Sequence, residues 1–187
     1  MSITKELRAK IRGMRDPFED DGGKKIPGSV RFIRELLPTA DSAEHRDELL
    51  VELGGEYLRA DLDNEHLLVQ RERVANQPGM AIPWIALSRT LSRRPEASAE
   101  AKAAAEKAVA ISRTCGTLVR YALLCQAEVA RQTCDSALFA QTIEALIVDA
   151  RNFREDDVNL DDRIVADLPE GFCDPRLEAR YRELLVP

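Results

Sequence analysis

The chain has 187 residues, of which 32% are charged and 5% aromatic, and its formal net charge at pH 7 is −6. A chain of this length can bury roughly 70% of its unfolded surface and needs no metal or disulfide for stability. The scarcity of aromatic residues favours an all-α protein over a β-sandwich. The acidic balance argues against nucleic acid as the main partner, because binding phosphates requires a basic face.

The sequence carries no sign of export or of a membrane span. Its first residues lack the apolar run of a signal peptide, and no stretch approaches the ~20 apolar residues that cross a bilayer. We therefore expect a cytoplasmic protein. The four cysteines form no Cys-x-x-Cys pair, and in a reducing compartment we expect them to be small buried residues.

The N-terminal region, residues 1–40, combines a basic helix, a linker and a short helix. Residues 3–14 place four apolar side chains at helical spacing and basic side chains on the other faces. Residues 16–29 contain proline, a glycine pair and mixed charges, which predict a loop or linker. Ser29 is the expected cap of the short helix, which Pro38 ends.

Residues 41–151 are almost continuously helical in pattern. Asp41, with Glu44 three residues later, resembles a capping box at the first helix. Short turns containing proline, glycine or aspartate then divide the segment. The predicted helices cover about 41–60, 64–76, 81–93, 99–112, 117–131 and 136–151.

Residues 152–187 form a different region. After Phe153 the sequence becomes acidic and loses the sustained helical stripe. Asp174 before Pro175 suits an N-cap followed by the first helical position, so a last helix is expected there. The region is interpreted as an acidic connector and a C-terminal capping helix.

The first helices of the three predicted pairs resemble one another. A shift of 34 residues aligns the first with the second, and a further shift of 38 reaches the third. The aligned positions are Leu50, Leu53, Gly54 and Tyr57; Trp84, Leu87, Ser88 and Leu91; and Ala122, Cys125, Gln126 and Val129. This resembles the tetratricopeptide repeat, whose first helix reads W-x2-L-G-x2-Y with a period of 34. The resemblance implies three helical hairpins in a right-handed solenoid with flanking terminal helices, and another all-α bundle is the alternative.

The second helix of the first hairpin departs from the family pattern. His66, Gln70 and Arg73 occupy slots that the family fills with small or apolar residues. That helix is therefore either shifted by one residue or degenerate. The resemblance makes Gly54 the small residue through which the two helices pack closely. For Gly55, room on the concave face and mere tolerance both stay open.

We find no pattern for chemistry in the sequence. The two histidines, His45 and His66, stand beside acids and are expected on exposed helix surfaces. The acidic run from Asp157 lacks the glycine and the glutamate of a calcium loop. Phosphate-binding loops, dinucleotide motifs and nucleophile elbows are absent from the sequence. We therefore expect no enzyme activity, no metal and no cofactor.

The resemblance also implies a binding surface, because the family holds peptides of partner proteins in a groove lined by the first helices. The expected apolar floor consists of Val51, Ile85 and Leu123. The expected basic rim consists of Arg59, Arg89, Arg93 and Arg131, and Arg120 is a further candidate. Because arginine forks suit carboxylates, an acidic peptide is the expected ligand. Ion pairs between these arginines and acids on neighbouring helices are the alternative.

The expected function is a non-catalytic protein–protein interaction module, an adaptor or scaffold, that binds a segment of a partner protein. The alternative is a regulatory protein that contacts nucleic acid or a membrane surface through the basic amphipathic N-terminal helix. That helix is equally interpreted as a cap on the end of the repeat. Homo-oligomer formation also stays open.

Overall fold

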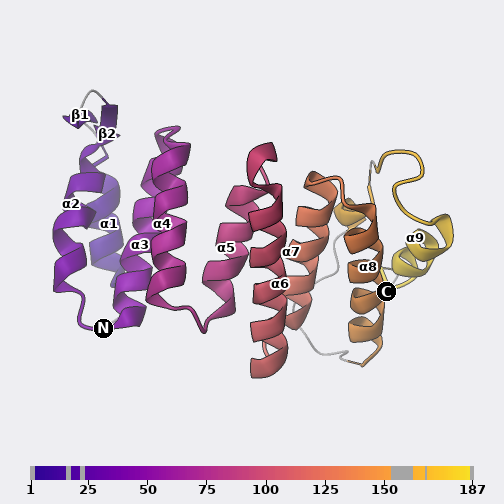
Figure 1. The fold of residues 1–187 in the computed structure, drawn as a ribbon. Coiled ribbons are helices and arrows are strands. Elements are labelled where there is room, and N and C mark those ends of the chain that lie inside the picture. Colours follow the sequence, from indigo (N-terminus) through magenta and orange to yellow (C-terminus); the bar gives the residue numbers. More distant parts are fainter. Residues whose placement is uncertain (1–2, 16–17, 22–23, 153–161, 167, 186–187) are drawn as a thin grey trace. The chain divides into compact units, whose positions relative to one another are not determined.

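The structure is a computed structural model that describes residues 3–15, 18–21, 24–152, 162–166 and 168–185. Helices dominate these residues, as the composition predicted (Figure 1). The chain divides into two compact units, Met1–Pro78 and Gly79–Pro187. The N-terminal region shares a core with the first helical hairpin, so this division differs from the predicted boundaries at residues 40 and 151.

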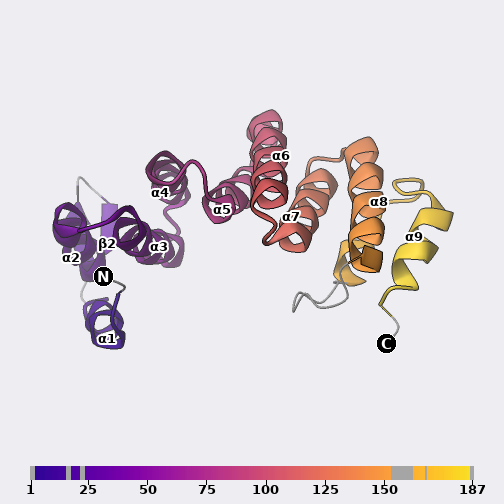
Figure 2. The same cartoon turned by 90° about the horizontal axis from the view of Figure 1, so that it is seen from below.

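The described residues of the first unit form four helices and a small hairpin of strands. Its elements are α1 (Lys5–Gly13), β1 (Phe18–Asp21), β2 (Lys24–Pro27), α2 (Gly28–Leu36), a 3-10 turn (Leu37–Thr39), α3 (Ala43–Arg59) and α4 (Asp63–Asn76). In Figure 2, which looks along these helices, α4 and α1 lie on different sides of α3. The core joins Ile11 of α1 and Ile33 of α2 to Leu50 of α3.

The prediction of a loop or linker at residues 16–29 was wrong for most of that segment. Strands β1 and β2 pair antiparallel, with Phe18 opposite Pro27 and Asp21 opposite Lys24. The sequence signal was the Asp-Gly-Gly run, since Asp-Gly and Gly-Gly are strong hairpin formers. Ile26 of β2 is buried in the core, which ties the hairpin to the helices.

Two predicted helix caps are displaced. Helix α3 is capped by Ser42, whose side chain accepts a hydrogen bond from the backbone N–H of His45 at 3.1 Å. Asp41 lies one residue too early, and its carboxylate contacts the His45 ring at 3.0 Å. Ser29 does not cap α2 either, because its hydroxyl donates to the carboxylate of Glu56 at 2.9 Å.

A chain of hydrogen bonds crosses the buried interface between α3 and α4. His66 Nδ1 lies 2.9 Å from the carbonyl oxygen of Gly54, and Gln70 Nε2 lies 3.3 Å from His66 Nε2. A carbonyl oxygen can only accept, so Nδ1 of His66 carries the hydrogen and Nε2 accepts from Gln70. His66 is buried, which corrects the expectation of an exposed histidine.

Arg73 continues this chain and anchors it to α3. Its Nη1 donates to Gln70 Oε1 at 3.1 Å. Its Nε and Nη2 donate to the two carboxylate oxygens of Asp47 at 2.9 and 3.0 Å, a bidentate pair. The three polar residues of α4 therefore face α3. The buried face of α4 is thus filled by polar groups that hydrogen-bond to one another and to α3.

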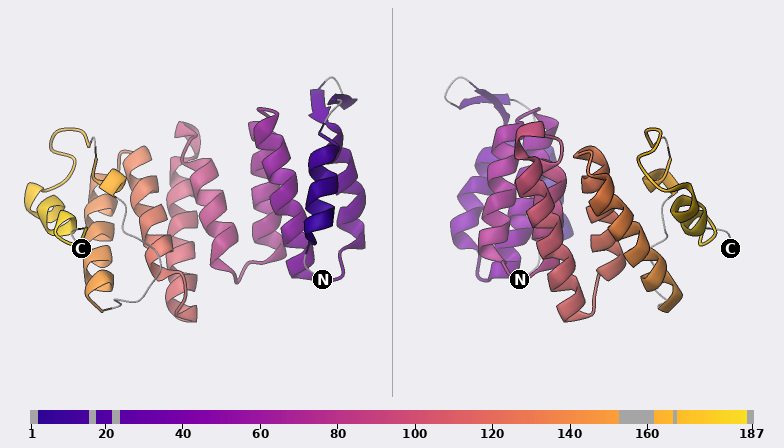
Figure 3. Two further views of the ribbon diagram at one scale, coloured as in Figure 1. Left: turned by 180° about the vertical axis from the view of Figure 1, so that it is seen from behind. Right: turned by 45° about the vertical axis from the view of Figure 1, so that its right-hand side comes forward.

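The second unit is a series of packed helices. Its elements are α5 (Ala81–Leu91), a 3-10 turn (Pro95–Ala97), α6 (Ser98–Cys115), α7 (Val119–Gln132), α8 (Ser136–Asn152), a 3-10 turn (Asp162–Ile164) and α9 (Pro175–Arg182). Figure 3 shows α7 between α6 and α8, with α9 beside α8. Helix α5 also contacts α7. Helices α3 to α8 thus provide the six helices predicted for residues 41–151, paired as adjacent hairpins.

The positions aligned by the repeat shifts face other helices. All of them are buried except Trp84, which is half-buried. The predicted last helix is also present, since Asp174 caps α9 by accepting from the backbone N–H of Arg176 at 2.8 Å. Its buried Leu177 and Tyr181 hold α9 in the unit.

Asp135 is expected to make the stability of the second unit depend on pH. Its carboxylate accepts from the backbone N–H of Leu138 and from Lys102 Nζ, both at 3.0 Å, and these contacts hold the pKa of Asp135 below its usual 3.8. The stabilisation is complete above the unfolded pKa and is lost as pH falls through the lower folded pKa.

Asp135→Ala should therefore lower the free energy of unfolding by about 1 kcal/mol at pH 7, the usual contribution of a helix cap. The difference from the parent should shrink below about pH 3.5, where the carboxylate is protonated in both states. Urea unfolding followed by fluorescence of Trp84, the single tryptophan, measures both values. An equal difference at pH 7 and pH 3 would contradict a role for the charge.

Candidate ligand-binding groove

Three of the four predicted rim arginines converge on one groove in the Gly79–Pro187 unit. The groove has a volume of about 510 Å³. It is lined by Arg89, Arg93, Tyr121, Leu124, Cys125, Glu128, Arg131, Gln132, Arg163 and Ile164, which we call the arginine groove.

Helical spacing explains how these side chains meet. Arg89 lies in the last turn of α5 and Arg93 lies two residues beyond the end of this helix, and both side chains line the groove. The lining residues of α7 recur at intervals of three and four from Tyr121 to Gln132, which places them on one face. The 3-10 turn Asp162–Ile164 contacts α7 and adds the remaining two residues.

The arginines differ in their partners. Arg131 pairs with Glu128, three residues earlier on α7, at 2.9 Å. Arg89 Nη1 lies 3.5 Å from the hydroxyl oxygen of Tyr121. Within the described part of the chain, neither Arg89 nor Arg93 forms an ion pair with a carboxylate. These two guanidinium groups therefore keep their charge available at the groove.

The groove is strongly cationic. Glu128 supplies the one carboxylate among the described lining residues, against four arginines. Cys125 adds no negative charge, because burial raises the pKa of its thiol. An anionic ligand is the chemical complement of such a surface.

None of the three residues predicted for the apolar floor lines the groove. Ile85 and Leu123 are 2% and 1% exposed, so both belong to the core and neither lines the groove. Leu124 and Ile164 supply apolar lining instead. Arg120 does not reach the groove, because it is buried and pairs with Asp149 of α8 at 3.2 Å.

The other predicted site residues lie in the first unit. Val51 is 46% exposed on α3. Arg59 is half-exposed and pairs with Glu56 at 2.6 Å. A Cβ atom on Gly55 would lie 3.4 Å from Arg59 Nη1, so the Arg59 side chain occupies the space that the glycine leaves. A Cβ atom on Gly54 would lie 3.2 Å from Gln70 Nε2, which makes Gly54 a close-packing position.

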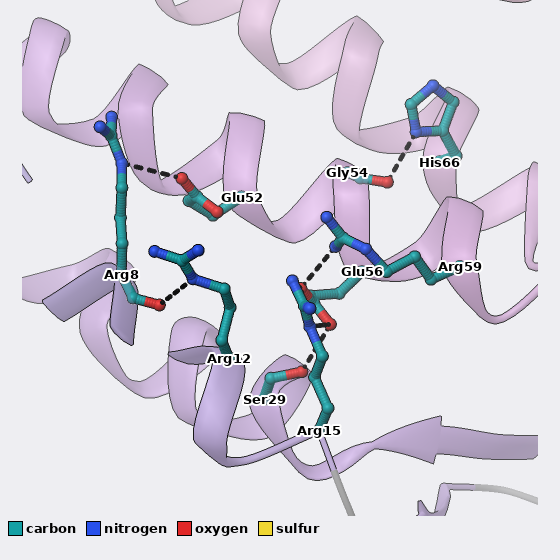
Figure 4. Close-up of polar contacts among 9 residues, drawn as sticks. All are labelled: Arg8, Arg12, Arg15, Ser29, Glu52, Gly54, Glu56, Arg59 and His66. Atoms are coloured by element: carbon teal, nitrogen blue, oxygen red, sulfur yellow. Dashed lines mark hydrogen bonds and ion pairs between the residues drawn. The ribbon is translucent and has the colours of Figure 1, made fainter. Parts of the chain in front are cut away.

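The basic N-terminal helix is docked against α3 through ion pairs (Figure 4). Arg8 contacts Glu52 at 3.1 Å, and the backbone N–H of Ile3 donates to Glu48. Arg15, just after α1, contacts Glu56 at 3.0 Å. These three glutamates are four residues apart on α3, and we call them the α3 acidic stripe.

Glu56 is the buried end of the stripe. Its carboxylate is fully buried and accepts hydrogen bonds from Arg15, Ser29 and Arg59. It therefore joins the end of α1 to α2 and α3. With Ile3 and Ile11 buried in the same core, this geometry agrees with the interpretation of α1 as a cap.

The expectation that the four cysteines are buried holds for one of them. Cys125 is buried as expected, whereas Cys115 and Cys134 are exposed and Cys173 is half-buried. Cys115 ends α6, and Cys134 lies in a turn with a φ of 54°, so neither position faces a core. The sequence offered no signal for Arg163 and Ile164, because the segment before them has no helical pattern that fixes its path.

Within the residues that the structure describes, no group of three or more His, Cys, Asp or Glu is arranged to hold a metal ion. None of the described helices is both long and apolar enough to cross a bilayer. Comparison of the chain with protein-family models, with curated proteins and with solved structures gave no match.

Proposed function

We propose that the protein is a non-catalytic interaction module whose arginine groove binds an acidic segment of a partner protein. The observation that supports this most directly is the convergence of Arg89, Arg93 and Arg131 on one groove. Arg89 and Arg93 have no carboxylate partner among the described residues, so their charge is available to a ligand. The groove volume of about 510 Å³ suits a few side chains of a bound segment.

The proposed architecture is a tetratricopeptide-like array. Its support is the pairing of successive helices and the burial of the aligned positions, including the small residues Gly54 and Ser88. In this proposal α1 and α9 are the terminal caps that a helical array requires. The apolar Ile11 of α1 is buried in the core of the first unit, so the alternative function would rest on the basic side chains that stay exposed on the docked helix, such as Lys5 and Arg12.

Replacing Arg89 and Arg93 together by alanine should weaken binding of an acidic peptide at least about tenfold. Each charge-assisted bond to a carboxylate contributes about 1.5–3 kcal/mol when shielded from water. The probe is a fluorescein-labelled peptide rich in aspartate and glutamate, and fluorescence anisotropy gives its dissociation constant. Circular dichroism should show unchanged helicity, since both side chains are exposed.

The matched control is Lys107→Ala with Arg113→Ala. Both residues are exposed on α6 and lie outside the groove lining, so this variant removes the same charge elsewhere in the unit. An equal loss of binding in the control would show only nonspecific attraction and would overturn the proposal. Unchanged binding in the Arg89 and Arg93 variant would also overturn it.

A further inference from the structure

We infer that the arginine groove selects a phosphoserine or phosphothreonine side chain over a single carboxylate. This inference rests on the proposed function, namely that the groove binds a segment of a partner protein. It adds the chemistry of the group that is recognised.

The first argument is charge balance. Glu128 already contacts Arg131 through both carboxylate oxygens and also accepts from Gln132. Arg89 and Arg93 remain as two guanidinium groups without a carboxylate among the described residues. One aspartate or glutamate balances one of them. A phosphate monoester carries about −1.5 to −2 at pH 7 and balances both.

The second argument is the arrangement of donors. Arg89, in the last turn of α5, and Arg93, in the turn that follows, line the same groove, and the hydroxyl of Tyr121 lies 3.5 Å from Arg89 Nη1. Two planar forks and a hydroxyl offer more donors than the two oxygens of a carboxylate use. A phosphate group presents three acceptor oxygens, which suits this set.

Because the groove lies at helix C-termini, only side chains can attract an anion to it. Arg89 lies in the last turn of α5 and Arg131 in the last turn of α7. A helix C-terminus carries about half a negative charge and presents no free N–H groups, so the backbone there does not attract an anion. The affinity for phosphate must then come from the guanidinium groups, and it should disappear with them.

The experiment uses three labelled peptide libraries of about eleven residues, identical except for a central serine, phosphoserine or glutamate. With the full chain, the phosphoserine library should bind about tenfold tighter than the glutamate library. Because the second pKa of a phosphate ester is about 6, lowering the pH from 7.5 to about 5.5 should weaken phosphoserine binding and leave glutamate binding nearly unchanged. In the double variant Arg89→Ala, Arg93→Ala the preference should vanish.

The possible failures are distinguishable. Equal binding of the phosphoserine and glutamate libraries would overturn this inference and leave the proposed function standing. Binding of neither library would overturn both. Inorganic phosphate that binds as tightly as the phosphoserine library would show a site for free phosphate, and this would overturn recognition of a phosphorylated segment. A preference that persists in the double variant would place phosphate binding outside this groove.

Discussion

Replacing Arg73 by alanine should lower the free energy of unfolding of the Met1–Pro78 unit by about 3 kcal/mol, the lower end of the range for breaking a buried ion pair. Arg73 is buried and forms the bidentate pair with Asp47, whose side chain is only 15% exposed. Without the guanidinium, the carboxylate of Asp47 and the amide oxygen of Gln70 lose their donors. Unpaired buried groups of this kind account for most of the cost.

Urea unfolding followed by far-ultraviolet circular dichroism measures this loss, and amide hydrogen exchange locates it in α3 and α4. The fluorescence of Trp84 reports the second unit and should change little. A double variant, Asp47→Leu with Arg73→Met, removes both charges and should recover most of the stability. If the single variant unfolds at the same urea concentration as the parent, the pair does not stabilise the unit.

Gly54→Leu should destabilise the same unit by about 1–3 kcal/mol, because added volume in a packed interface forces the helices apart. A Cβ atom at Gly54 would lie 3.2 Å from Gln70 Nε2 and 3.3 Å from His66 Nδ1. Both neighbours are buried and held in the hydrogen-bond chain, so they have little room to move. A larger side chain must therefore break that chain or separate α3 from α4.

The neighbouring glycine provides the matched control. Gly55→Ala should raise the free energy of unfolding by about 0.5–1 kcal/mol, since alanine is the better helix former. The nearest atom to the new Cβ is the half-exposed guanidinium of Arg59 at 3.4 Å, which can shift into solvent. Thermal and urea unfolding should thus show a lower free energy of unfolding for Gly54→Leu and a higher one for Gly55→Ala than for the parent. If both variants change the free energy of unfolding in the same direction relative to the parent, Gly54 has no special packing role.

Much of the helical arrangement follows from local sequence. Periodicity locates α3 to α8, and Asp174–Pro175 predicts α9, because these signals lie within a few residues of the element they specify. Of the arginines named from the sequence, Arg89, Arg93 and Arg131 line one groove and Arg59 does not. Ile85 and Leu123, which were named with them, turn into the core.

What sequence reasoning missed depends on partners far along the chain. From the sequence alone, surface positions are expected for His66, Gln70 and Arg73. In the structure, His66 contacts the Gly54 carbonyl and Arg73 contacts Asp47. Glu56 looks like any exposed glutamate until Arg15 and Ser29 meet it. Arg163 enters the groove from a segment with no periodic signal. In each case the deciding contact joins residues that no local pattern connects.

The buried polar residues of α4 also affect which helix it pairs with during folding. A chain of similar helix pairs risks docking a helix on the wrong neighbour, a common fault of repeated structures. Shifts of 34 and then 38 residues align Asp47 with Ala81 on α5 and Val119 on α7, and Gly54 with Ser88 and Gln126. Docked on either helix, α4 would bury the charge of Arg73 without a carboxylate, at a cost of several kcal/mol. The buried pair of Arg73 with Asp47 thereby favours docking of α4 on α3 over the other helices.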